Sequence, residues 1–119
     1  MKIAIDMDGT FWEHWTFFGE MGRGLQALGH QVGILTGHDV AIEAEDRRLL
    51  LARCNFTPDF FLNRDDEALK RYVIEWKAEI LDKEGIDVHY DDDAAAIAKH
   101  LKNGTFLIKT RSSTEADKF

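Results

Sequence analysis

Blocks of apolar and polar residues alternate along this chain in a pattern that predicts five strands separated by four helices. Short apolar runs bounded by polar residues are typical of strands that are buried on both faces of a parallel sheet. The predicted strands are residues 2–6, 31–35, 59–62, 86–90 and 105–109. Apolar residues at helical spacing predict helices at 21–28, at 40–53, within 66–84 and from 94 to about 101.

Polar residues and glycines mark where these helices begin and end. Asp39 is expected to cap the start of the second helix. The residues expected to end the first three helices are Gly29, Asn55 and Gly85. The fourth helix is expected to be capped near Asn103 and Gly104. The first residues of the 66–84 segment are also compatible with a loop.

Strands that alternate with helices predict an α/β protein with a three-layer, Rossmann-like fold. The sheet is expected to be five-stranded and parallel, with right-handed crossovers and helices on both faces. A length of 119 residues suits one domain, which we place at 1–109, followed by a polar and frayed C-terminal tail at 110–119. In such sheets, ligands bind at the carboxyl ends of the strands, near a topological switch point.

Polar residues gather where three of the predicted strands end. Asp6 and Asp8 follow the first strand, Thr36 and Gly37 the second, and residues 91–93 (DDD) the fourth. An i, i+2 spacing aims two side chains to the same side of an extended chain. Two carboxylates so close favour a proton or a cation, and a hard divalent ion such as Mg²⁺ prefers oxygen ligands.

An ordinary turn or a calcium loop is the alternative interpretation of the DMDG segment at 6–9. A calcium loop needs further oxygen ligands at alternate positions and a glutamate near its end. Phe11, Trp12 and Trp15 follow instead. The segment therefore favours phosphate chemistry over a calcium loop.

Composition and charge narrow the classes of partner. A net charge of −7 and a pI near 5.1 disfavour tight nonspecific nucleic-acid binding, although a strand end held locally through a metal ion stays open. No apolar run is long enough for a membrane span, no N-terminal signal pattern is present, and Cys54 is the single cysteine. We therefore expect a cytoplasmic protein without a membrane partner, and a homo-oligomer is compatible with the sequence.

Four short segments, in this order, resemble the motifs of the haloacid dehalogenase superfamily, and specifically of its phosphatases. They are residues 6–10 (DMDGT), residues 34–37 (ILTG), the helical Lys77, and residues 88–93 (VHYDDD). The resemblance covers residues 1 to about 109. One departure is Phe11, at a position where an aliphatic residue commonly follows the threonine.

The resemblance implies a Mg²⁺-dependent phosphomonoester hydrolase that works through an aspartyl-phosphate. It makes Asp6 the nucleophile and Asp8 the general acid and later the base, with Thr36 and Lys77 completing the catalytic set. The substrate-binding residues that it implies are Gly9, Thr10, Thr36, Gly37 and Lys77.

For the metal, the resemblance implies Asp6, Asp8 through its backbone carbonyl, Asp91 and Asp92 as ligands. Asp92 best matches the direct ligand, whereas Asp91 would orient the site or pair with Lys77. Asp93 is expected to cap the following helix. Among the histidines, His38 is placed near the site, and His89 is expected on the sheet surface.

The resemblance also bears on the substrate. In this superfamily, cap domains are inserted after the first motif or between the second and third. Here the first gap holds the aromatic run 11–18 and a short helix, and the second holds one helix–strand–helix stretch. We therefore expect a capless enzyme with an open site for a phosphorylated small molecule or polymer end. The aromatic run is expected to form core or an association surface, with stacking on a substrate base as the alternative.

Three other functions stay open at this point. One is a nucleic-acid-end phosphatase, similar to the phosphatase modules of polynucleotide kinases. The second is a receiver-like signalling domain, which needs an aspartate at the end of the third strand, where this chain has Asn63. The third is a catalytically silent phosphate-binding protein on the same fold.

Overall fold

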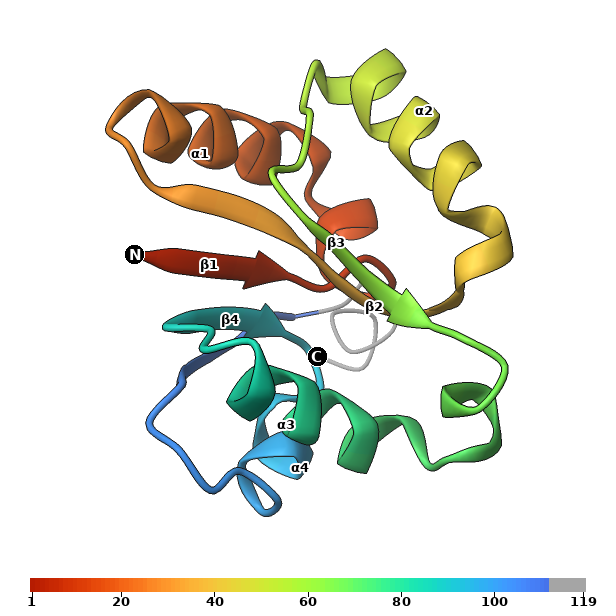
Figure 1. Cartoon of the computed structure of the whole chain (residues 1–119). Coiled ribbons are helices and arrows are strands. Elements are labelled where there is room, and N and C mark those ends of the chain that lie inside the picture. The colour runs from red at the N-terminus through yellow and green to blue at the C-terminus, as the bar shows by residue number, and fades with distance from the viewer. Residues whose placement is uncertain (112–119) are drawn as a thin grey trace.

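The structure is a computed structural model of the chain, and it describes residues 1–111. Its centre is a sheet of five parallel strands (Figure 1). The strands are β1 (Lys2–Ile5), β2 (Gln31–Asp39), β3 (Phe61–Arg64), β4 (Val88–Asp91) and β5 (Phe106–Lys109). Their order in the sheet is β3-β2-β1-β4-β5. The predicted α/β, Rossmann-like fold is confirmed.

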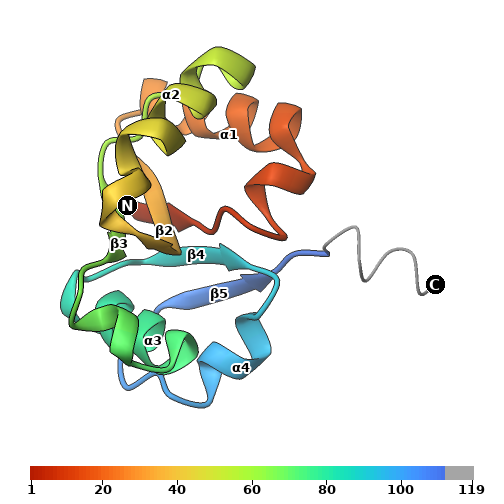
Figure 2. The same cartoon turned by 90° about the vertical axis from the view of Figure 1, so that its right-hand side faces the viewer.

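Helices cover the sheet on both faces. One layer holds α1 (Trp15–Ala27) and α2 (Glu43–Cys54), and the other holds α3 (Val73–Lys83) and α4 (Ala94–Ala98), as Figure 2 shows. Three short 3-10 helices complete the described chain: η1 (Phe11–Glu13), η2 (Val40–Ile42) and η3 (Ala68–Lys70). The result is the expected three-layer arrangement.

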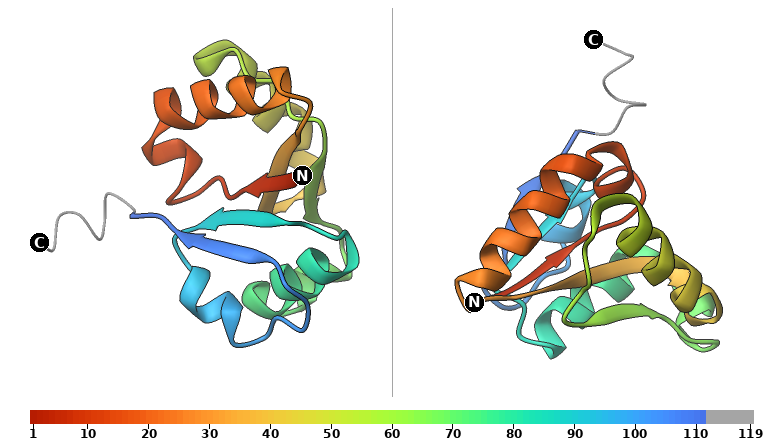
Figure 3. Two further views of the ribbon diagram at one scale, coloured as in Figure 1. Left: turned by 90° about the vertical axis from the view of Figure 1, so that its left-hand side faces the viewer. Right: turned by 90° about the horizontal axis from the view of Figure 1, so that it is seen from above.

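The chain changes direction across the sheet between β3 and β4. From β1 it passes outward to β2 and then to the edge strand β3, and α3 then carries it over the other face to β4, beside β1. Figure 3 shows α1 and α2 over one half of the sheet, and the arrowheads of β4 and β5 pointing toward the same edge. The switch point therefore lies between β1 and β4, where ligands bind in sheets of this kind.

Each face of the sheet has its own apolar core. Ile5, Phe11 and Phe18 lie in the core beneath α1 and α2, whereas Leu35 and Trp76 lie in the core beneath α3 and α4. Burying such side chains contributes roughly 1.5–3 kcal/mol each. The aromatic run 11–18 thus supplies core through two of its phenylalanines, as expected, while Phe17 is 58% exposed.

Several element boundaries differ from the predicted ones. α1 begins at Trp15, six residues before the predicted 21, because the burial of Phe18 continues its apolar face toward the N-terminus. β2 runs to Asp39 rather than 35, and β3 is 61–64 rather than 59–62. Before β3, the Asp59 carboxylate accepts the N–H of Val32, and β3 as a strand begins at Phe61.

The helix ends predicted from the sequence are confirmed only in part. Gly29, Asn55 and Gly85 all have positive φ angles, which confirms that they end their helices. The Asp39 side chain caps η2 through the N–H of Ala41, and α2 begins later, at Glu43. α4 ends at Ala98, so the expected cap near Asn103 and Gly104 is wrong. The backbone N–H of Asn103 instead donates to the Asp82 carboxylate. Asp93 does occupy the N-cap position of α4, as expected, but its side chain makes no capping hydrogen bond.

The segment after β5 does not fray at once. The N–H of Thr110 donates to the carbonyl of Asp91, and the Thr110 and Thr10 hydroxyl oxygens are 2.8 Å apart. Tail residues 112–119 lie outside the described residues. Among the helices of residues 1–111, none combines the length and the apolar character that crossing a membrane would require.

Candidate functional site

Asp6 lies at the carboxyl end of β1, next to the switch point. Its backbone N–H donates to the carbonyl of Tyr90 on β4, and only 3% of the residue is exposed. The chain then turns through residues 7–10, where Gly9 adopts a φ of +78°. A Cβ at Gly9 would lie 2.4 Å from Oδ2 of Asp92, so only glycine allows this close approach.

Lys77 reaches this point from α3, in the helical layer that also holds α4. Its Nζ lies 2.9 Å from Oδ1 of Asp6 and 2.7 Å from Oδ2 of Asp91, and the residue is 5% exposed. Burial alone would lower the pKa of Lys77, but the charges of Asp6 and Asp91 outweigh burial and raise it. The ammonium group therefore stays charged between the two carboxylates.

Asp91, at the end of β4, is fully buried and accepts three hydrogen bonds. Its Oδ2 accepts from Lys77 and lies 2.9 Å from Nε2 of His89, and its Oδ1 accepts from the N–H of Asp93. Burial works against ionisation, but the hydrogen bond from His89 and the charge of Lys77 hold the pKa of Asp91 well below its usual range. Asp91 thus pairs with Lys77, as the resemblance implies.

Three carboxylates converge here. One oxygen from each of Asp6, Asp91 and Asp92 lies within 4.8 Å of the others. Burial raises the pKa of Asp6 well above its ordinary value, and Asp91 and Asp92 add to this, while Lys77 opposes it. Burial also raises the pKa of Asp92, with the charges of Asp93 and Asp91 adding to the effect. The group has more negative charge than one lysine offsets.

This donor set fits a hard divalent cation. All three groups offer carboxylate oxygens, which suit Mg²⁺ or Ca²⁺ better than the softer metals that prefer nitrogen or sulfur ligands. A cation would also lower the mutual repulsion that the raised pKa values express. The geometry therefore supports a metal-binding group at Asp6, Asp91 and Asp92.

Asp8 lies apart from these three carboxylates. β1 ends at Ile5 and residues 7–10 form a turn, so Asp6 and Asp8 do not lie on one side of an extended strand, and that expectation is wrong. The Asp8 side chain is 69% exposed, and its Oδ2 lies 2.5 Å from Nε2 of His38. Ligation by its backbone carbonyl stays a prediction.

An open pocket of about 470 Å³ lies over these groups. It is lined by Asp6, Asp8, Gly9, Glu13, Thr36, Gly37, Val73, Lys77, Asp92 and Asp93. Thr36 is buried, and its Oγ1 accepts the N–H of His38. Thr10 does not line the pocket, but its hydroxyl is 3.3 Å from Oδ2 of Asp6 and accepts the N–H of Asp92. The structure thus brings the sequence-predicted residues to one place.

Sequence reasoning missed two polar residues at this site. His89 is fully buried behind Asp91, with Nδ1 2.9 Å from the carbonyl of Ala4, and not on the sheet surface. Asp46, on α2, is also buried and lies 2.7 Å from Nδ1 of His38. The signal for His89 was its place two residues before Asp91, whereas Asp46 has no local signal because its contact depends on how α2 packs.

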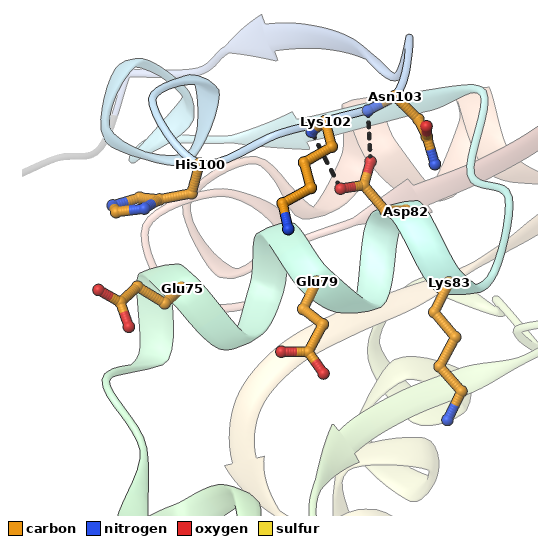
Figure 4. Close-up of a pocket in the computed structure, with 7 residues that line it drawn as sticks. All are labelled: Glu75, Glu79, Asp82, Lys83, His100, Lys102 and Asn103. Atoms are coloured by element: carbon orange, nitrogen blue, oxygen red, sulfur yellow. Dashed lines mark hydrogen bonds between the residues drawn. The ribbon is translucent and has the colours of Figure 1, made fainter.

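A second hollow, of about 510 Å³, lies on the outer side of α3 (Figure 4). Its lining is Glu75, Glu79, Asp82, Lys83, His100, Lys102 and Asn103. The Asp82 carboxylate there accepts the backbone N–H groups of Lys102 and Asn103, which fixes the loop between α4 and β5. The Asp82 contacts give this hollow a structural role. None of the residues that line it also lines the pocket over Asp6.

The chain matches no protein-family model, and a search of curated proteins gives no match either.

Proposed function

We propose that this chain is a Mg²⁺-dependent phosphomonoester hydrolase of the haloacid dehalogenase superfamily. The observation that carries the proposal is convergence at the switch point. Asp6 after β1, Thr36 and Gly37 on β2, Lys77 on α3 and Asp92 after β4 all line one pocket. These residues come from the four segments that resemble the superfamily motifs, in the same order along the chain.

The roles follow from charge and position. Asp6 attacks phosphorus, the bond to the leaving oxygen breaks, and an aspartyl-phosphate forms. Asp8 gives its proton to the leaving oxygen and later takes one from the water that hydrolyses the intermediate. Lys77 and the Thr36 hydroxyl stabilise the phosphoryl oxygens, which is the main demand of phosphoryl transfer.

Asp6, Asp91 and Asp92 would hold the metal, with the Asp8 carbonyl as the further ligand that the resemblance implies. Bound Mg²⁺ would offset the negative charge of the phosphate beside these carboxylates. Lys77 alone faces two carboxylates already, so without a cation the site would repel an anionic substrate.

The strand order argues against a receiver-like domain. Flavodoxin-like sheets, to which receivers belong, have the order 2-1-3-4-5 and place the third strand beside the first. Here β3 is an edge strand separated from β1 by β2, and Asn63 near its end donates to Glu43. A catalytically silent phosphate-binding protein is the alternative from another class. Measured turnover of a phosphomonoester would exclude it, and phosphate binding without turnover would favour it.

The charge of the pocket favours small substrates. Asp8, Glu13, Asp92 and Asp93 all line it, against the single lysine. Acidic residues around the opening repel further phosphates, so a small phosphomonoester suits this pocket better than the end of a nucleic-acid strand. The open shape of the pocket and the paired acids Asp91 and Asp92 at the end of β4 are the features that favour the strand end.

The test is a phosphatase screen with Mg²⁺ over small phosphates, nucleotides and 3′-phosphorylated oligonucleotides, with wild type and Asp6→Asn. An amide cannot form the intermediate, so we expect Asp6→Asn to lower kcat by several orders of magnitude. Excess chelator is expected to abolish wild-type turnover. The matched control is Asp66→Asn, at an exposed aspartate outside the pocket lining.

Asp6→Asn turnover above about a tenth of the wild-type value would refute the nucleophile. Hydrolysis that persists in excess chelator would refute the metal requirement. A wild type that binds phosphate but turns over no substrate would favour the silent binding protein.

A further inference from the structure

Two side chains outside the proposed phosphate chemistry connect α2 to Asp8. Asp8 is largely exposed, and an exposed aspartate would normally exchange among rotamers in water. Here its Oδ2 is held 2.5 Å from Nε2 of His38, across thirty positions of sequence. The carboxylate that the proposed reaction needs for proton transfer therefore has a fixed partner.

His38 is itself fixed on two sides. Its Nδ1 lies 2.7 Å from Oδ2 of the buried Asp46, and its backbone N–H donates to the Thr36 hydroxyl. Each ring nitrogen therefore faces a carboxylate oxygen, Nδ1 that of Asp46 and Nε2 that of Asp8. The ring is a rigid bridge between a buried carboxylate and an exposed one.

We propose that His38, held by Asp46, is a positioning residue that fixes the Asp8 carboxylate at the edge of the phosphate pocket. This inference rests on the proposed function, in which Asp8 moves the proton. With Oδ2 bound to His38, Oδ1 is the oxygen that carries the proton to the leaving group as the phosphorus–oxygen bond breaks. Asp8 regains a proton from the attacking water, so the step needs no proton from His38.

The competing explanation is that His38 merely ties β2 to α2. Two substitutions separate the explanations, because they each keep one half of the imidazole. The amide of His38→Asn lies near the position of Nδ1 and can still reach Asp46, but it is too short for Asp8. The amide of His38→Gln reaches the position of Nε2 and can still donate to Asp8.

The kinetic readout is kcat for an alkyl phosphate and for nitrophenyl phosphate. We expect His38→Asn to lower kcat for the alkyl phosphate about 10- to 100-fold, since misplacing a catalytic group by about 1 Å has effects of this size. Nitrophenyl phosphate, whose leaving group departs without a proton, is expected to lose much less. His38→Gln should recover most of the alkyl-phosphate rate.

Two further variants sharpen this test. In an Asp8→Asn background, His38→Asn should cause no additional loss, because residues that act as a unit are not additive. The control is His100→Asn, at an exposed histidine beside α4, which should leave both rates unchanged. A loss below twofold for His38→Asn, equal losses for both substrates, or His38→Gln being worse than His38→Asn would each overturn the proposal.

A crystallographic comparison needs no activity. We expect one Asp8 rotamer on His38 in the wild type, and a shifted or divided one in His38→Asn. An unchanged Asp8 position in the variant would refute positioning by His38. If the wild type hydrolyses no phosphomonoester but this comparison gives the expected shift, the proposed function has failed while the contact has not.

Discussion

At the scale of single residues, the main feature of the site is that several charged groups are buried close together. Asp6 and Asp91 face one ammonium group from the two sides, in a place from which water is largely excluded. The pKa of Asp6 is raised while that of Asp91 is held low, so the two carboxylates hold protons with different strength although they share Lys77. Such separation of pKa values is typical of functional sites.

Lys77→Met tests how much this charge balance depends on the lysine. Removing the ammonium leaves two buried carboxylates facing each other, which typically lowers the free energy of unfolding by about 3–5 kcal/mol. We expect a loss of this size at neutral pH in chelator, measured by chemical denaturation, and a partial recovery with Mg²⁺.

Lys70→Met is the matched control, because Lys70 and its partner Glu67 are both exposed. An exposed ion pair contributes about 0–1 kcal/mol, so the control should change little. A Lys77→Met variant as stable as the control would mean that Asp6 and Asp91 do not depend on the ammonium.

Gly9→Ala tests the turn that brings Asp92 to Asp6. The residue has a φ of +78°, and an added Cβ would lie 2.4 Å from Asp92. We expect a loss of about 1–3 kcal/mol in unfolding free energy, and weaker Mg²⁺ binding by titration, because Asp92 must move. Gly24→Ala, in α1 with open space around it, should instead be neutral or stabilising. Equal Mg²⁺ affinity in Gly9→Ala and wild type would contradict this account of the turn.

At the scale of elements, the sequence predicts the order and type of the strands and helices, because apolar runs and glycine or asparagine helix ends are local signals. The sequence does not predict those features that depend on contacts between distant parts of the chain. β2 continues through Thr36 to Asp39, where Asp39 pairs with Arg64 on β3 after a shift in register that the sequence does not reveal. The link from His38 to Asp46 cannot be read from periodicity, because only the packing of α2 against the sheet creates it.

The β2–α2 link predicts a pH dependence of stability. Burial lowers the pKa of His38, but hydrogen bonds to Asp46 and Asp8 outweigh burial and raise it above 6.5. A raised folded-state pKa means that the contribution of His38 is complete below about pH 6.5 and is lost as the pH rises through the folded value. In chelator, the wild type should therefore exceed His38→Asn in Tm by more near pH 6 than near pH 8.5.

The raised pKa of Asp6 acts in the same direction, because it makes the folded protein without metal less stable as the pH rises above the ordinary aspartate range. Asp6 is present in both proteins, so its effect cancels in the comparison of wild type with His38→Asn. A Tm difference that stays constant, or that grows with pH, would show that the imidazole is not charged in this bridge.

At the scale of the whole molecule, the candidate site exists because of the strand order. The carboxyl ends of β1, β2 and β4 are neighbours only because the chain reverses between β3 and β4. This reversal brings Asp6 and Asp91 into contact with Lys77 on α3. Four sequence segments predict that meeting. The buried His89 is instead placed by the pairing of β4 with β1, and the buried Asp46 by the packing of α2 against the sheet.

If metal binding needs this assembled arrangement, then Mg²⁺ must stabilise the folded chain, because the unfolded chain has no such group. At a concentration about 100 times Kd, a ligand that binds only the folded state adds about 2.7 kcal/mol, or a rise of several degrees in Tm. We expect this rise for the wild type at constant ionic strength, and a much smaller one for Asp92→Ala. Asp66→Ala, at an exposed aspartate, should respond like the wild type. An equal rise in Asp92→Ala would place the cation elsewhere, and no rise in any of the three proteins would refute a Mg²⁺ site at the switch point.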